Sequence, residues 1–176
     1  LNELARQVRD RGVTRIDGDV VIDTRLWAAD SDSGIPVTPI FVNDNILDIM
    51  VSESGVEATP KTGAYTVASQ VKTGDDTQLS VQADPTDPTK LTVTGTIVAG
   101  HKQLTSYRPP DAADWARTLF VEALLRAGVA VTAPPVRANN EAVLPAKGSY
   151  APDRKVASIQ SPPLQAMGSM ILETSY

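Results

Sequence analysis

The sequence predicts an α+β fold, mostly antiparallel sheet with two or three helices, in which a β-rich subdomain is inserted into an α+β unit. Three observations lead to this fold class. Apolar and polar residues alternate from about 46 to 100, as they do in half-buried strands. An apolar stripe at helical spacing runs through residues 111–127, and shorter helical patterns lie near both ends of the chain.

The first 45 residues predict a helix, an extended segment and a loop. Residues 1–11 place apolar side chains at helical spacing, and Gly12 supplies the left-handed conformation that commonly ends a helix. Residues 14–24 alternate as a strand or hairpin does. Residues 28–39 are rich in Asp, Gly and Pro and therefore indicate a loop.

The middle third predicts antiparallel sheet. In four stretches, alternate residues share one face of a strand. These stretches are 47–51, 65–71, 79–83 and 91–97. Glycine, aspartate and proline residues lie between them, where turns are needed.

The last third predicts two helices. Asp111 is suited to cap the first helix, whose apolar stripe includes Trp115. We expect both tryptophans, Trp27 and Trp115, in the core. Residues 155–161 predict a strand, and a last helix is expected from about Leu164, after the helix-breaking prolines.

Composition excludes several kinds of function. Sixteen Lys and Arg against 21 Asp and Glu give a net charge of -5, and the basic residues are scattered, so we expect no nucleic-acid partner. No apolar run reaches the roughly 18 residues of a membrane span. Cysteine is absent, the acidic residues lack the spacing of a calcium loop, and we expect neither a metal nor another cofactor. The only histidine, His101, indicates a solvated loop residue rather than a catalytic one.

Residues 68–76 contain two short patterns of serine acyl-enzymes. Ser69 and Lys72 read as S-x-x-K, and Lys72-Thr73-Gly74 reads as K-T-G, as does Lys61-Thr62-Gly63. S-x-x-K requires a helix so that serine and lysine share a face. This stretch alternates as a strand, in which positions three apart point to opposite sides. We therefore expect no active site here, and a turn at Lys61-Thr62-Gly63.

Four ordered elements of the chain carry a family resemblance. They are VRDRGVTRIDGDVVIDTRLW, Val42-Asn43-Asp44-Asn45, the helix PDAADWARTLFVEALLRAGVAV and Ser161-Pro162-Pro163-Leu164. In the first, the residues that fit are Arg11, Gly12, Ile16, Gly18, Asp19, Val20, Val21, Ile22 and Asp23. Together these elements resemble the D-alanyl-D-alanine carboxypeptidase/endopeptidases of the class C low-molecular-mass penicillin-binding proteins.

The resemblance places this chain in the insertion between the S-x-x-K and S-x-N motifs of that family. The nucleophile and the true K-T-G would then lie outside the chain. Ser175 would be the first residue of S-x-N, with the asparagine one position beyond Tyr176. The alternative is that Ser175 is simply a polar residue at a helix end.

The resemblance implies a serine hydrolase as the whole protein. Its serine would attack a D-alanyl peptide bond of peptidoglycan through an acyl-serine intermediate, and peptidoglycan peptides and β-lactams would be partners of the complete enzyme. It implies an extracytoplasmic location, in the periplasm or at the exterior of the cell envelope, with the signal peptide outside this chain. The chain alone would be an inactive accessory segment.

The expected organisation has three parts. Residues 1–45 and 101–155 form an α+β accessory domain, 46–100 an inserted β-subdomain, and 156–176 the return to the catalytic, transpeptidase-like domain. Two alternatives stay open. The chain could be a free-standing β-rich binding module without an enzymatic parent, or a small hydrolase built on Ser69 and Lys72.

Overall fold

The protein is an α+β structure, as its sequence predicts. The computed structural model describes residues 1–32 and 35–174. The helices are α1 (Asn2–Asp10), α2 (Ala112–Arg126) and α3 (Leu164–Thr174), with short 3-10 turns η1 (Asn43–Asn45), η2 (Glu141–Val143) and η3 (Pro152–Arg154). The strands are β1 (Arg15–Ile16), β2 (Asp30–Asp32), β3 (Ile35–Val37), β4 (Leu47–Ser52), β5 (Gly55–Thr59), β6 (Thr66–Gly74), β7 (Gln78–Ala83), β8 (Lys90–Val98), β9 (Lys102–Tyr107) and β10 (Ala130–Val131). Within the described ranges, no helix is both long and apolar enough to cross a membrane.

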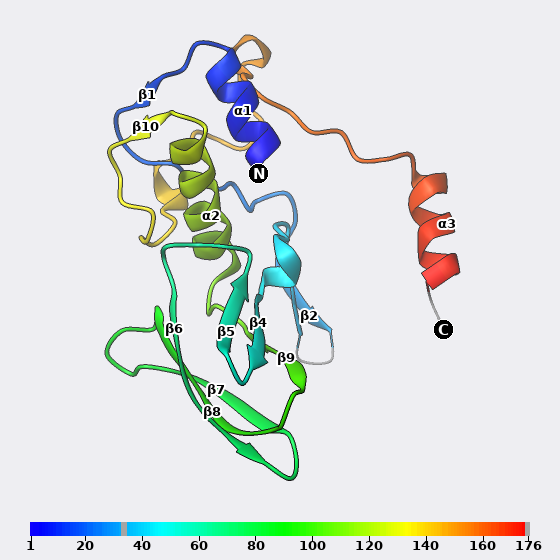
Figure 1. Cartoon of the computed structure of the whole chain (residues 1–176). Helices are drawn as coiled ribbons and strands as arrows, with labels where there is room; N and C mark the ends of the chain where they lie inside the picture. Colours follow the sequence, from blue (N-terminus) through cyan, green and yellow to red (C-terminus); the bar gives the residue numbers. More distant parts are fainter. Residues whose placement is uncertain (33–34, 175–176) are drawn as a thin grey trace.

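Two three-stranded sheets make up the β-rich half, seen in the lower part of Figure 1. Strand β4 is central in one sheet and pairs antiparallel with β5 and β9. Strand β8 is central in the other sheet, where it lies antiparallel to β7 but parallel to β6. The predicted antiparallel pattern is therefore correct except at β6. The reason is that β8 inserts between β6 and β7, so the two strands joined by the turn after Gly74 are not neighbours.

The inner faces of these sheets enclose the first of two hydrophobic cores. Its buried residues are Leu47, Ile49, Val51, Leu91, Val93, Ile97, Trp115 and Leu119. The strand residues are those that the alternation of apolar positions predicts to face inward. Trp115 and Leu119 come from α2, which closes this core from above in Figure 1.

The second core lies where α1 packs against the other side of α2. Its buried residues are Ala5, Val8, Val20, Val121, Ala123, Leu124 and Val129. The short parallel pair β1 and β10 borders it, with Ile16 opposite Val131. Helix α2 thus contributes to both cores, which explains why eight of its 15 residues are buried.

Only one of the two tryptophans is a core residue. Trp115 is 1 % exposed, and its indole N–H donates to the Val42 carbonyl at 3.1 Å. Trp27 is 50 % exposed, so the prediction that it lies in the core is wrong. The chain before Trp27 is held at the surface by polar contacts, which leave its ring outside both cores.

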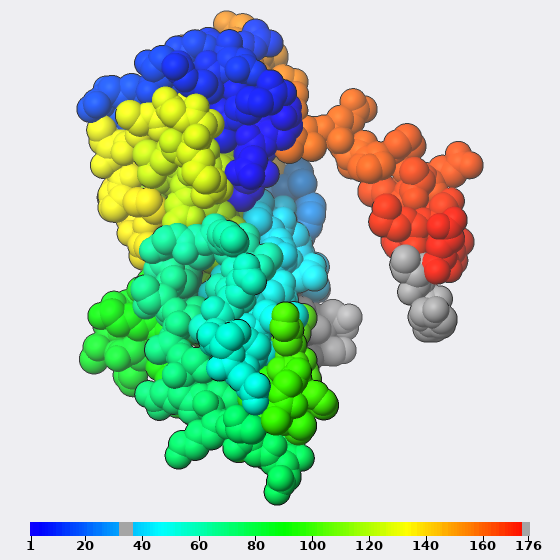
Figure 2. Space-filling view, in the orientation of Figure 1, coloured from blue at the N-terminus to red at the C-terminus, as the bar shows by residue number. Residues whose placement is uncertain are grey.

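Two irregular segments also differ from the sequence-based expectation. The predicted loop at 28–39 contains the hairpin strands β2 and β3. Residues 155–161 are irregular and do not form the predicted strand; the Ser158 N–H donates to the Gln7 side chain at 2.9 Å, which ties this segment to α1. From there the chain leads to α3, which stands apart from the rest of the molecule in Figure 2.

The Tyr65 ring joins the first core between two other aromatic rings. It lies edge-on to Trp115, with ring centres 5.6 Å apart, and 6.0 Å from the ring of Tyr107. Burial, with smaller contributions from Tyr107 and Asp114, raises the pKa of Tyr65 to about 12 from its usual 10.0. The folded state therefore favours the uncharged phenol.

This pKa predicts a loss of stability at alkaline pH. The contribution of Tyr65 is fully present below pH 10, the pKa of the unfolded chain, and is lost as the pH rises toward 12. Denaturant midpoints measured at pH 8, 10 and 12 should fall less steeply in Tyr65→Phe than in the native chain. Parallel curves for the two proteins would contradict the assignment.

Candidate functional site

The serine and lysine of the S-x-x-K pattern do not form a catalytic pair. Both lie on strand β6, as predicted, and three residues separate them, so their side chains leave opposite faces of the sheet. The Ser69 hydroxyl accepts a hydrogen bond from the Val71 N–H at 3.4 Å, and Lys72 is exposed. The hydrolase built on these two residues has no geometric basis.

The K-T-G pattern at 61–63 is a loop fastened to helix α2. The Thr62 hydroxyl and the Gly63 N–H both donate to Oε1 of Glu122, each at 2.9 Å. The lysine, Lys61, is exposed, and its ammonium lies 3.7 Å from the Glu57 carboxylate. The predicted turn is confirmed, and its threonine and glycine anchor the loop before β6.

Two sequence-based candidates remain, His101 and Ser175, and the described residues place neither of them in a catalytic arrangement. His101 is exposed in the turn between β8 and β9, as expected of a solvated loop residue. Ser175 lies outside the described residues. Across the described ranges, no three His, Asp or Glu side chains gather as a metal site would require.

Asp19 and Asp23, which belong to the first of the four resemblance elements, each form an ion pair with an arginine. The first is Asp19 with Arg117, whose guanidinium is fully buried in α2. Arg117 also donates to the carbonyls of Pro134 and Pro135, at 3.1 and 2.8 Å. Burial alone would raise the pKa of Asp19, but hydrogen bonds from Arg117 and the Val20 N–H, with the charge of Arg137, hold it below its usual value. Asp19 is therefore ionised and joins three segments of the chain.

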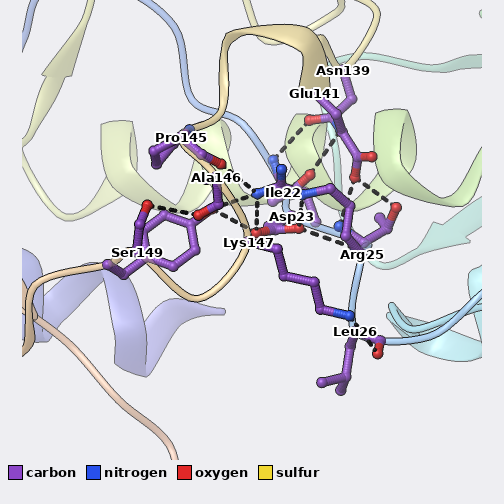
Figure 3. A network of polar contacts seen from close by, with 12 residues as sticks. Ile22, Asp23, Arg25, Leu26, Asn139, Glu141, Pro145, Ala146, Lys147 and Ser149 are labelled. Carbon is purple, nitrogen blue, oxygen red and sulfur yellow. Dashed lines mark hydrogen bonds and ion pairs between the residues drawn. The ribbon is translucent and has the colours of Figure 1, made fainter.

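The second ion pair belongs to a polar clamp, formed by Asp23, Arg25, Asn139, Glu141, Lys147 and Tyr150 (Figure 3). The Arg25 guanidinium donates to both oxygens of Asp23 at 2.8 Å and to the Pro145 carbonyl at 3.1 Å. The Tyr150 hydroxyl donates to Asp23 at 2.5 Å. Hydrogen bonds from Arg25 and then Tyr150 hold the pKa of Asp23 well below its usual range.

Where a strand was expected over 14–24, β1 ends at Ile16 and the clamp holds residues 22–24 instead. The Asn139 side chain accepts from the Ile22 N–H at 2.7 Å and donates to the Ile22 carbonyl at 2.9 Å, which imitates a neighbouring strand. Glu141 accepts from both the N–H and the hydroxyl of Thr24 at 2.6 Å. Side chains therefore satisfy the backbone groups that a sheet partner would otherwise bind.

A pocket of about 510 Å³ lies beside the clamp. It is lined by Thr24, Arg25, Trp27, Ala28, Ala29, Thr38, Pro39, Ile40, Asp111, Ala112, Ala113 and Lys147. The exposed Trp27 ring provides an apolar wall, and Arg25, Lys147 and Asp111 provide charges of both signs. The two hydroxyls that line the pocket are already hydrogen-bonded: Thr24 donates to Glu141 at 2.6 Å, and Thr38 donates to the Ile40 carbonyl at 2.7 Å.

Sequence reasoning missed this pocket for an identifiable reason. The adjacent Arg25, Leu26 and Trp27 gave a signal, because tryptophan and arginine are enriched at binding surfaces. The assignment of Trp27 to the core hid that signal. The partners Asn139, Glu141 and Lys147 come from a segment over 110 residues away, whose irregular sequence predicts no spatial neighbour.

The sequence profile of the D-Ala-D-Ala carboxypeptidase 3 (S13) family matches residues 1–175. Among solved structures, the chain is similar to penicillin-binding protein 4 from Haemophilus influenzae, crystallised in complex with a β-lactam, with a TM-score of 0.52 and 18 % identity. The match covers 74 % of this chain and 31 % of that protein, so it spans about a third of that relative's length. At this identity the likeness is one of fold. No curated protein sequence matches the chain.

Proposed function

The chain belongs to the D-Ala-D-Ala carboxypeptidase 3 (S13) family, and from this premise we propose that it is an accessory segment of a serine D-Ala-D-Ala carboxypeptidase/endopeptidase, non-catalytic except for Ser175. The whole enzyme cleaves D-alanyl peptide bonds of peptidoglycan outside the cytoplasmic membrane. Its serine forms an acyl intermediate, with a lysine as the activating base. Peptidoglycan peptides and β-lactams bind the complete enzyme. Family membership favours this parent over a free-standing binding module.

Helix α3 is the observation that carries the proposal. Leu164 and Leu172 are each 80 % exposed, and Ile171 is 64 % exposed. Short helices gain most of their stability from packing an apolar face, and this helix has little such packing in the described chain. Its apolar side chains therefore suit a partner surface, which we assign to the catalytic domain of the same enzyme.

Ser175 follows directly on α3 and is the one residue to which we give a catalytic role. We assign it as the first residue of S-x-N, with asparagine after Tyr176. The serine would relay a proton to the leaving amine of the D-alanyl bond. The S-x-x-K nucleophile and the K-T-G strand come from other parts of the enzyme.

For the rest of the chain we propose the following division, with one adjustment to the bounds expected from the sequence. Residues 1–45 and 101–155 form the accessory α+β domain around the second core, and 46–100 the inserted β-subdomain around the first. Strand β9 pairs with β4 over six residues, which supports extending the β-subdomain to Tyr107. Residues 156–176 return to the catalytic domain.

The pocket beside the clamp suits a position at the mouth of the substrate cleft. Leu26, Trp27 and Phe41 are each at least half exposed and provide apolar surface near it. Arg25 and Lys147 add positive charge that complements peptide carboxylates. In this arrangement the accessory domain shapes access of stem peptides to the catalytic serine.

The assignment of Ser175 is tested in the complete enzyme with two matched substitutions. Ser175→Ala should lower kcat/KM for a peptide ending in D-Ala-D-Ala by about 100-fold or more, the usual contribution of a positioned proton relay. Ser69→Ala, on the exposed strand β6, should leave hydrolysis unchanged. Loss of activity in Ser69→Ala, with full activity in Ser175→Ala, would refute the proposal, as would a residue other than asparagine after Tyr176.

A further inference from the structure

The outer face of the sheet β6-β8-β7 is a regular grid of nine side chains. Alternate residues of these strands, such as Val67, Val81 and Val93, point into the first core, so the intervening residues point outward. Strand pairing aligns them in three rows. The rows are Ala68, Thr92 and Gln82; Gln70, Thr94 and Ser80; and Lys72, Thr96 and Gln78. We call this surface the polar grid.

The polar grid is open to solvent and almost uncharged. The three threonines on central β8 are partly exposed, and the six residues on β6 and β7 are exposed. Lys72, at one corner, is the only charged member, although 21 % of the chain is charged.

Most hydrogen-bonding groups of the polar grid have no partner within the described residues. Gln78 donates to Asp76 at 2.7 Å, and Thr96 donates to the same carboxylate at 3.3 Å. No such contact within the described chain occupies the side chains of Gln70, Ser80, Gln82, Thr92 and Thr94. Hydroxyl and amide groups both donate and accept, so these five can bind a ligand that does the same.

The chemistry of the polar grid selects one class of partner. A nucleic acid needs several cations, and the grid has one. A protein interface needs apolar or aromatic anchors, and the grid has none larger than Ala68. A chain of sugar residues is uncharged and presents hydroxyls along its length. The hydroxyls of such a chain would face the donors and acceptors of the polar grid. These are spaced about 4.8 Å apart between neighbouring strands and about 6.7 Å apart along one strand.

We propose that the polar grid binds an uncharged glycan strand rich in hydroxyl and acetamido groups. The identity of this glycan as the sugar backbone of the cell wall rests on the proposed function; the chemical class rests on the grid itself. Because no aromatic ring stacks on the sugar, binding at the grid alone is weak, and it gains strength when the same enzyme molecule also holds the wall through its catalytic site. The β-subdomain would thereby hold the enzyme on the polymer whose peptides it cleaves.

The test uses the 176-residue chain and chitohexaose, an uncharged oligomer of N-acetylglucosamine. In NMR titrations, the amide signals of β6, β7 and β8 should shift, and those of α1 should not. The variant Thr92→Val/Thr94→Val keeps the shape and strand preference of both side chains but removes their hydroxyls. It should raise the Kd for chitohexaose at least tenfold.

The matched control is Thr73→Val, the same substitution on β6 at an exposed position on the opposite side of the sheet. It should bind as the native chain does. Absence of shifts in the three strands, or equal affinity of the double variant, would overturn the proposal. Because neither result depends on hydrolysis, failure here is separate from failure of the Ser175 assignment, which is read from the activity of the complete enzyme.

Discussion

Replacement of Gly95 by alanine should lower the free energy of unfolding by about 3–5 kcal/mol or prevent folding. Gly95 lies in the middle of β8, opposite Leu79 of β7, with a φ of +118°. A Cβ atom there would stand 1.9 Å from the carbonyl oxygen of Gln78 and 3.0 Å from its carbonyl carbon. These atoms belong to the backbone, so no side-chain rotation relieves the overlap. Strand β7 would have to move away from β8.

Denaturant unfolding of Gly95→Ala, beside Gly63→Ala, measures this effect. Gly63 has an ordinary φ, and a Cβ there would meet only Oε1 of Glu122, at 3.7 Å. Gly63→Ala should therefore change stability by no more than about 0.5 kcal/mol. If the two variants unfolded at the same denaturant concentration, the close approach of β7 and β8 would be incorrect.

Replacement of Arg117 by methionine should cost about 3–5 kcal/mol, the range for breaking a buried ion pair by removing one partner. Its guanidinium is 0 % exposed and makes hydrogen bonds to Asp19 and to the carbonyls of Pro134 and Pro135. Methionine fills similar space but leaves these acceptors without their donor. Lysine should not rescue stability, because one ammonium cannot reproduce the planar fork of a guanidinium.

Arg126, in the same helix, provides the control. Its side chain is 52 % exposed, and its pairing distance to Glu122 is 3.9 Å. Arg126→Met should cost less than Arg117→Met, because Arg126 is half exposed to water and lies 3.9 Å from the Glu122 carboxylate, which is itself 12 % exposed. Thermal or denaturant unfolding of the two Arg→Met variants separates the cases. Equal losses would mean that burial of Arg117 does not determine its contribution.

The sequence predicted those elements whose residues carry a local periodic signal. Leu47, Ile49 and Val51 are buried on β4 as their alternation requires, and α2 begins after the cap at Asp111, whose carboxylate accepts from the Asp114 N–H at 2.8 Å. The motif at Val42–Asn45 is a turn held by side-chain hydrogen bonds. The family resemblance read from the ordered motifs is confirmed by the match over residues 1–175.

What the sequence did not predict depends on contacts between distant segments. The parallel pairing of β6 with β8 follows from the insertion of one strand between two others, which alternation within a strand does not encode. The polar clamp joins Asp23 and Arg25 to residues more than 110 positions later. Tryptophan is mostly buried on average, which is why the sequence predicts Trp27 in the core. Its 50 % exposure follows from the polar clamp, which holds the preceding residues at the surface.

The sharing of α2 between the two hydrophobic cores has a consequence for how the chain denatures. Trp115 and Leu119 serve one core, while Val121, Ala123 and Leu124 serve the other. Unfolding of either half would remove apolar contacts from the same 15-residue helix, α2, and would thereby lower the stability of the other half. The two halves are therefore thermodynamically coupled through α2, and neither can be excised without exposing apolar residues of that helix.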